Sequence, residues 1–178
     1  MEHPFRMSTQ TVRPATVRDA KAIARVHAAV TQAIQREFFG LSPIGGPSLD
    51  ERQNYWREAI EYSEPQVQVA IEGETMVGFV GFDRSRDKGT PSNTGELWAL
   101  CVLPDHWQQG VGTALWDAAN DGLKEEGCTR VTVWVPVRNE RALQFFEHAG
   151  FKREMSSLRT VQIGSITVEE IRLRRELI

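Results

Sequence analysis

The sequence lacks the features that mark membrane, disulfide-rich and metal-binding proteins. Its longest uninterrupted apolar run, residues 97–103, has seven residues, whereas a membrane-spanning helix needs about 20. The first ten residues hold charges and a proline but no apolar segment, which argues against a secretory signal peptide. Two cysteines are too few for a disulfide framework, and no two of the four histidines show metal-ligand spacing. We therefore expect a cytoplasmic protein with no membrane segment and no metal.

The sequence also lacks a strong excess of either charge. Lys and Arg total 21 and Asp and Glu total 24, so the net charge is −3. A chain this close to neutrality has no overall electrostatic attraction to nucleic acid or to an anionic membrane, and neither is expected as a partner. Apolar residues make up 40% and charged residues 25% of the 178 residues, which is typical of a globular domain and argues against a disordered chain.

The order of apolar patterns predicts a mixed α/β domain. Alternating or continuous apolar runs predict strands near residues 11–13, 67–71, 76–82, 97–103, 131–135, 152–162 and 165–174. Three- and four-residue apolar spacing, with capping residues before it and glycines after it, predicts helices ending near Gly40, Tyr62, Gly127 and Gly150. The predicted order is β-α-α-β-β-β-α-β-α-β-β, with loops at residues 41–47 and 84–93 and a last turn at Ile163–Gly164.

One connection between a strand and a helix has the composition of an anion-binding turn. The apolar run that ends at Leu103 leads through His106-Trp107-Gln108-Gln109-Gly110-Val111-Gly112 into a helix. The first amides of a helix have no partner inside it, and the helix dipole adds partial positive charge there. Glycines let the main chain approach an anion without an intervening Cβ. A phosphate or pyrophosphate is the ligand that this turn favours.

Two other phosphate-binding motifs, the Walker A loop and the dinucleotide fingerprint, require particular residues at this turn. A Walker A loop needs a Lys after the second glycine, where this sequence has Thr113, and it is excluded. A dinucleotide fingerprint needs a small residue at Leu115 and an acidic residue at the end of the next strand, where Pro136 stands, so it is disfavoured. A plain strand–helix connection, in which the glycines only close the turn, stays open on these residues alone.

A second segment, residues 139–151, helps to choose among these interpretations of the turn. It begins with Asn139 and continues as a helix of the pattern A-x-x-F-F-E-x-x-G-F. Together the two segments resemble the signatures of the GNAT superfamily of N-acetyltransferases, Arg/Gln-x-x-Gly-x-Gly/Ala and an Asn followed by a helix A-x-x-F-Y-E-x-x-G-F. The resemblance implies one N-acetyltransferase domain at residues 9–178 after a short extension at residues 1–8. It also implies a mixed sheet of about seven strands between about four helices, with strands 97–103 and 131–135 splayed apart.

The resemblance further implies acetyl-CoA as co-substrate, lying between the splayed strands. Main-chain groups of the first strand would pair with the pantetheine, amides of the turn would bind the pyrophosphate, and two residues of the second signature would complete the site. These residues are Leu100, Cys101 and Val102; Gln108, Gln109, Gly110, Val111, Gly112 and Thr113; and Asn139 and Phe146.

The sequence departs from the family pattern at two positions. Trp107 stands where the first signature usually has Arg or Gln. Because backbone amides do most of the phosphate binding, we expect cofactor binding to persist. Phe146 stands at the usual position of the catalytic Tyr and has no hydroxyl with which to protonate the departing thiolate. A thiol with a pKa near 8.5 is a good leaving group, so the reaction can proceed without an acid, and water or another tyrosine are the alternative acids.

Acetyl transfer to an amine needs a base, because an amine with a pKa near 10.4 is almost entirely protonated at neutral pH and cannot attack a thioester in that form. Glu96, fourteen residues before Gly110, resembles the general base of histone-type members and would act through a water. The alternative is that Glu96 only begins a strand at the surface. Trp98 and Trp134 lie on the two strands expected to separate, and one of them is a candidate for lining the pocket.

The leading hypothesis is an enzyme that transfers acetyl to a primary amine of a small molecule, peptide or protein by direct attack. No histidine stands at a recognisable spacing from Cys101 in the sequence, so we interpret Cys101 as a buried strand cysteine rather than a nucleophile. The alternatives are an acyl-CoA-binding protein with little or no turnover, motivated by Phe146, and a nucleotide or dinucleotide binder. The resemblance also implies an acceptor pocket formed by the first helices, residues 41–47 and the final strands, and a possible homodimer through the last strand.

Overall fold

The computed structural model describes residues 10–40, 46–163 and 166–177. The expected N-terminal extension, residues 1–8, lies outside these ranges. So do most of the expected loop at residues 41–47 and Gly164 of the last expected turn. Among the described residues, the helices are too short or too polar to cross a membrane.

The predicted order of strands and longer helices is confirmed. The strands are β1 (Gln10–Pro14), β2 (Gln66–Glu72), β3 (Thr75–Arg84), β4 (Thr94–Val102), β5 (Arg130–Pro136), β6 (Lys152–Ile163) and β7 (Ile166–Glu176). The α-helices are α1 (Ala20–Phe39), α2 (Leu49–Tyr62), α3 (Val111–Glu125) and α4 (Glu140–His148). Short 3₁₀ turns occupy Val17–Asp19 and Pro104–His106. Since β4 begins at Thr94, Glu96 lies inside this strand and does not open it.

Local signals in the sequence explain where the first two helices begin. Thr16 and Asp19 form a capping box at the 3₁₀ turn that leads into α1, and the Asp19 carboxylate accepts a hydrogen bond from the Thr16 amide at 2.7 Å. Ser48 and Glu51 form a second capping box at the start of α2. Each box satisfies amides that have no partner inside the helix.

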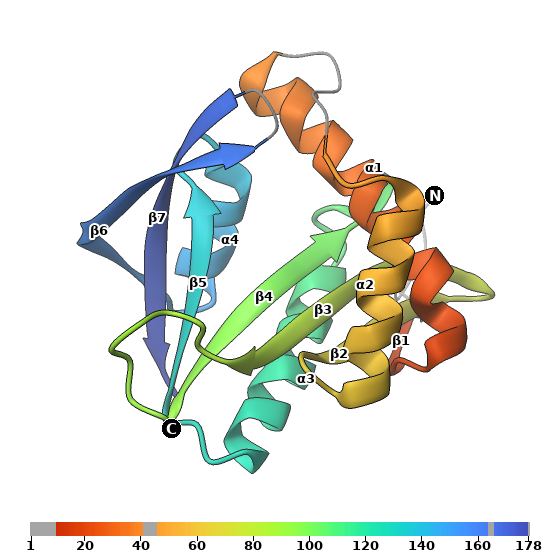
Figure 1. The fold of residues 1–178 in the computed structure, drawn as a ribbon, viewed down its shortest axis with the longest axis horizontal. Helices are drawn as coiled ribbons and strands as arrows, with labels where there is room; N and C mark the ends of the chain where they lie inside the picture. Colours follow the sequence, from red (N-terminus) through yellow and green to blue (C-terminus); the bar gives the residue numbers. More distant parts are fainter. Residues whose placement is uncertain (1–9, 41–45, 164–165, 178) are drawn as a thin grey trace, which may run out of the picture.

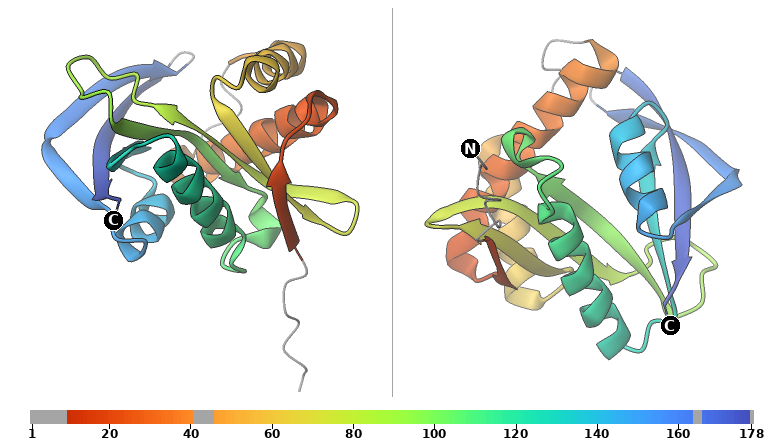
Figure 2. Two further views of the ribbon diagram at one scale, coloured as in Figure 1. Left: turned by 90° about the horizontal axis from the view of Figure 1, so that it is seen from below. Right: turned by 180° about the vertical axis from the view of Figure 1, so that it is seen from behind.

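The seven strands form one sheet in the order β1-β2-β3-β4-β5-β7-β6. All neighbours are antiparallel except β4 and β5, which are parallel. Helices α1 and α2 cover one face of the sheet, and α3 and α4 cover the other (Figures 1 and 2). Each face has its own apolar core, so the sheet is the middle of three layers.

The parallel pair β4 and β5 separates partway along, as the resemblance implied. The two strands pair from Thr94 with Arg130 to Leu97 with Val133, and beyond this point they diverge (Figure 1). A bulge accompanies the separation, since Phe82 and Gly81 of β3 pair with Leu97 and Ala99 and leave Trp98 as the extra residue. A bulge bends and twists a strand, which turns the end of β4 away from β5.

Candidate active site

The turn between β4 and α3 has the backbone geometry of an anion site. Gly110 precedes α3 with φ +85°, and Gln108 also has a positive φ, of 60°, which is uncommon for a residue with a side chain. The first hydrogen bond into the helix runs from the Ala114 amide to the Gly110 carbonyl. The amides of the three residues before Ala114 therefore lack helical partners, as predicted from the sequence.

The two glycines of this turn serve different purposes. A Cβ on Gly110 would meet nothing within 4 Å, so this glycine supplies the left-handed backbone and leaves open space in front of the helix. A Cβ on Gly112 would lie 3.0 Å from the Phe145 ring. Gly112 thus allows α3 to pack closely against α4.

A cavity of about 330 Å³ lies at the diverging end of β4 and β5. We call this region the open end. Eight of the residues that the resemblance assigned to the cofactor line the cavity: Leu100, Val102, Gln108, Gly110, Gly112, Thr113, Asn139 and Phe146. Helix α1 contributes Val30, Ile34 and Phe38, which no motif had indicated. The other lining residues are His106, Trp107, Arg141, Ala142, Gln144, Phe145 and His148.

Three of the expected cofactor residues lie away from the cavity wall. Cys101 and Val111 are buried in the two apolar cores, on opposite faces of the sheet. Gln109 is exposed, and its side chain donates a hydrogen bond to the Asp105 carbonyl at 3.1 Å. Contact of Cys101 or Val111 with a ligand in the cavity would therefore be through the main chain.

Asn139 has a structural task as well as a place on the cavity wall. Its Oδ1 accepts a hydrogen bond from the Ala142 amide at 3.1 Å and so caps α4. The side chain is buried, and the cap fixes its orientation. Its amide nitrogen is thereby left to donate to a bound molecule.

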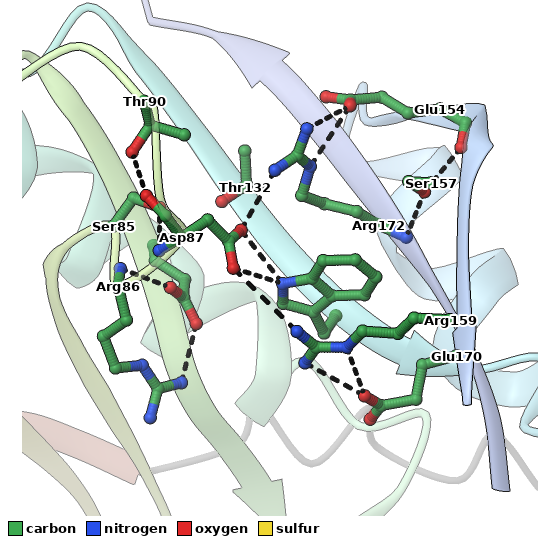
Figure 3. A network of polar contacts seen from close by, with 12 residues as sticks. Ser85, Arg86, Asp87, Thr90, Thr132, Glu154, Ser157, Arg159, Glu170 and Arg172 are labelled. Atoms are coloured by element: carbon green, nitrogen blue, oxygen red, sulfur yellow. Dashed lines mark hydrogen bonds and ion pairs between the residues drawn. The ribbon is translucent and has the colours of Figure 1, made fainter. Parts of the chain in front are cut away.

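Glu96 lies at the other end of the gap, where β4 and β5 still pair. Its neighbour Leu97 points into the core under α3, so Glu96 points to the face covered by α1 and α2. The side chain is only 2% exposed and receives two hydrogen bonds from Arg86, from the main-chain amide at 2.9 Å and from the guanidinium at 2.6 Å (Figure 3). Glu96 does not line the cavity at the open end.

A polar network that sequence reasoning missed lies next along the chain from Arg86, the partner of Glu96. The loop between β3 and β4 carries Asp87, whose carboxylate accepts hydrogen bonds from the Trp134 indole and the Arg172 guanidinium, both at 3.0 Å (Figure 3). Arg159 stacks on the Trp134 ring at 3.5 Å. We call the group Arg86, Asp87, Glu96, Trp134, Arg159 and Arg172 the loop end. It ties the loop to β5, β6 and β7.

The ion pairs of the loop end bury the anion more deeply than the cation. Arg86 is 50% exposed against 2% for Glu96, and Arg159 is 43% exposed against 16% for Asp87. Burial opposes the charge of Arg172, but its hydrogen bonds to Glu154 and Asp87 outweigh burial and raise its pKa.

Comparison with known proteins decides the family. The model of the acetyltransferase (GNAT) family matches residues 28–151, which is most of the chain. The chain belongs to this family. It is 27% identical over 166 residues to the uncharacterized N-acetyltransferase YuaI of Bacillus subtilis, a match that covers 92% of this chain and 91% of that protein.

Other GNAT relatives match only in part. A mycothiol acetyltransferase of Propionibacterium freudenreichii is 38% identical over 80 residues, which are 45% of this chain. This chain spans a quarter of the length of that relative, and a fifth of that of a second mycothiol acetyltransferase, from Beutenbergia cavernae.

Solved structures confirm the GNAT fold. An N-acetyltransferase of Staphylococcus aureus superposes with a TM-score of 0.76 at 17% identity and covers 96% of this chain and all of that one. The protein yncA of Salmonella typhimurium, a putative acetyltransferase solved with acetyl-CoA, gives a TM-score of 0.72 at 19% identity and covers 95% and 94% of the two chains.

The two departures from the GNAT signatures have visible surroundings. Trp107 donates its indole hydrogen to the Val102 carbonyl at 2.7 Å, so it caps the end of β4 at the open end. Phe146 is buried and packs edge-to-face against Phe145 and Phe151, with ring centres about 5 Å apart. Neither Trp98 nor Trp134 lines the cavity.

Proposed function

We propose that this protein is an N-acetyltransferase that moves the acetyl group of acetyl-CoA to a primary amine by direct attack, with residues 9–178 as one catalytic domain. The observation that carries the proposal is the cavity at the open end. It joins the diverging edge of β4 to the amides at the start of α3. This arrangement suits a ligand that has a phosphate group at one end and a narrow chain that can lie beside a strand.

In the proposed complex, the unpaired amides around Gly110 bind the pyrophosphate and the pantetheine lies along β4. Leu100 and Val102, which line the cavity, face it there. Because Trp107 already holds the Val102 carbonyl, the main chain at Leu100 is the freer partner. Asn139 donates its amide hydrogen to the pantetheine arm.

The amine approaches from the face covered by α1 and α2, where Glu96 lies. Its nitrogen attacks the thioester carbon, the carbon–sulfur bond breaks, and CoA leaves as a thiolate. The proton of the amine passes through a water to Glu96. Each Glu96 oxygen accepts one hydrogen bond from Arg86 and keeps a second lone pair for the water, and displacement of the Arg86 guanidinium would free one oxygen entirely. That guanidinium is half exposed and rests on the Trp98 ring at 4.1 Å, so it has room to move.

Two observations support direct attack without a covalent acetyl-enzyme. Burial raises the pKa of the Cys101 thiol to about 12, so almost no thiolate is present at neutral pH. The Cys101 side chain lies in the core under α1 and α2 and does not line the cavity. With Phe146 at the usual tyrosine position, the thiolate leaves unprotonated or takes a proton from water.

The test is release of CoA thiol from acetyl-CoA in the presence of a panel of amines. The panel includes polyamines, amino acids and peptide N-termini, and mass spectrometry identifies the acetylated product. We expect thiol release that depends on at least one amine and equals the amount of acetylated product. Binding of acetyl-CoA with no release above hydrolysis for any amine would instead support the binding-only alternative. A cytoplasmic location and a homodimer stay predictions.

A further inference from the structure

The wall of the cavity carries an arginine that no signature singled out. Arg141 lies in the first turn of α4, two residues after the cap Asn139, and lines the cavity together with Gln108 and Gly110. Its guanidinium stacks on the Trp107 ring at 4.2 Å. Trp107 stands at the position where the family signature usually has Arg or Gln, so a cation lies beside this position but comes from α4.

The surroundings of Arg141 leave part of its hydrogen-bonding capacity unused. One terminal nitrogen pairs with Glu37 of α1 at 2.5 Å, and both side chains are more than one-third exposed. Among the described residues, the Arg141 Nε is buried and has no hydrogen-bond partner. A buried donor without a partner costs stability unless something else accepts its hydrogen bond.

The charge of the cavity wall indicates what that acceptor is. The described lining residues include one arginine, Arg141, and no aspartate or glutamate. The start of α3 adds the partial positive charge of its free amides. The cavity is therefore built for an anion, and a guanidinium presents two parallel donors that match phosphate oxygens.

We infer that Arg141 binds the diphosphate of acetyl-CoA and supplies the cation that Trp107 does not. Trp107 holds the guanidinium in place by stacking, and Glu37 is its partner until the cofactor binds. The diphosphate is preferred to the 3′-phosphate because Arg141 shares the cavity with the main chain of Gln108 and Gly110. This inference rests on the proposed function.

The test compares three ligands on three proteins by calorimetric titration. The ligands are acetyl-CoA, 3′-dephospho-acetyl-CoA and S-acetylpantetheine, which has no phosphate. The proteins are the wild type, Arg141→Gln and the matched control Glu37→Gln, which breaks the same ion pair from the other side. We expect Arg141→Gln to raise the Kd of both CoA ligands about tenfold to a hundredfold, the range for a charge-assisted hydrogen bond, and to leave S-acetylpantetheine within about twofold. Glu37→Gln is expected to leave all three unchanged or to tighten the CoA ligands.

Several outcomes would overturn the inference. Equal weakening by Arg141→Gln and Glu37→Gln would show that the ion pair only supports the fold. A loss for S-acetylpantetheine as large as for acetyl-CoA would remove the phosphate from the explanation, and a loss confined to acetyl-CoA would move the contact to the 3′-phosphate. If Arg141→Gln folds poorly, Arg141→Lys replaces it, and an unchanged Kd for S-acetylpantetheine with a raised Kd for acetyl-CoA is again expected. A wild type that binds none of the ligands would refute the proposed function itself.

Discussion

The two ends of the gap between β4 and β5 differ in the groups that form them, which are main-chain groups at one end and side chains at the other. The open end depends on main-chain geometry, with a left-handed glycine and free amides at the start of α3. The loop end depends on side chains that come from β4, β5, β6, β7 and the β3–β4 loop. Main-chain geometry tolerates most side chains around it, whereas a side-chain network is specific to each sequence. We infer that the open end serves the cofactor shared by the family and the loop end serves this protein's own chemistry.

The largest effect on activity is expected when the proposed base, Glu96, is replaced. Glu96→Gln keeps the size of the side chain and one acceptor for Arg86, but it cannot take a proton. We expect kcat to fall by about 10² to 10⁴, the usual contribution of general base catalysis, with an unchanged Kd for acetyl-CoA. The control is Glu154→Gln, which changes another carboxylate of the same network and should preserve most of kcat. Unaltered kcat across pH 6 to 9 in Glu96→Gln would refute the role of Glu96.

The next variant tests whether the loop end is held by Asp87. Asp87→Asn removes the charge that faces Arg172 and keeps one acceptor for the Trp134 indole. Because this ion pair is largely buried, we expect the free energy of unfolding to fall by about 1 to 3 kcal/mol, measured in urea. The exposed pair of Arg130 and Glu176 is the control, and Glu176→Gln should cost at most about 1 kcal/mol. Equal losses in the two variants would contradict the account.

Two glycines with similar φ, Gly110 at the open end and Gly127 after the far end of α3, distinguish an effect on binding from an effect on stability. Gly110 and Gly127 have φ values of +85° and +82°, and a Cβ on either would meet nothing within 4 Å. Alanine at either position should cost about 1 kcal/mol of stability from left-handed strain. Gly110→Ala should also raise the Kd of acetyl-CoA severalfold, because it disturbs the amides in front of α3. If Gly127→Ala weakens binding as much, the effect is on the whole fold.

The last prediction concerns the pH dependence of stability at the contact between α1 and α2. Burial is the main cause that lowers the pKa of His27 to about 4 from its ordinary 6.5. Its Nδ1 accepts a hydrogen bond from the Trp56 indole at 3.2 Å, which requires an unprotonated nitrogen.

The unfolded chain binds a proton at His27 more readily than the native protein does between pH 6.5 and 4. The contribution of neutral His27 is therefore complete above pH 6.5 and is lost as the pH falls toward 4. Urea unfolding at pH 7 and pH 5 should show a larger drop in stability for the wild type than for His27→Gln. Identical drops would mean that His27 titrates normally.

The sequence predicted one end of the gap far better than the other, for a physical reason. Residues 104–113 are contiguous, so their glycines and their place between a strand and a helix are visible in the sequence. Asp87 and Arg172 lie 85 residues apart and meet only because β5 and β7 pair beside the β3–β4 loop. The residues between 84 and 93 showed a polar loop but not its partners. Arg141 was similarly hidden, since nothing local connects it to Trp107 or Glu37.

The central claim is that the cavity at the open end binds acetyl-CoA, and thermal unfolding tests it most directly. The melting temperature is measured with acetyl-CoA at about 100 times its Kd and, in parallel, with NAD and with ATP. Binding at that saturation stabilises the fold by about 2.7 kcal/mol, which raises the Tm of a domain of this size by about 5 to 10 °C. The account predicts such a shift for acetyl-CoA and none comparable for NAD or ATP. No shift with acetyl-CoA, or a larger one with either control, would contradict it.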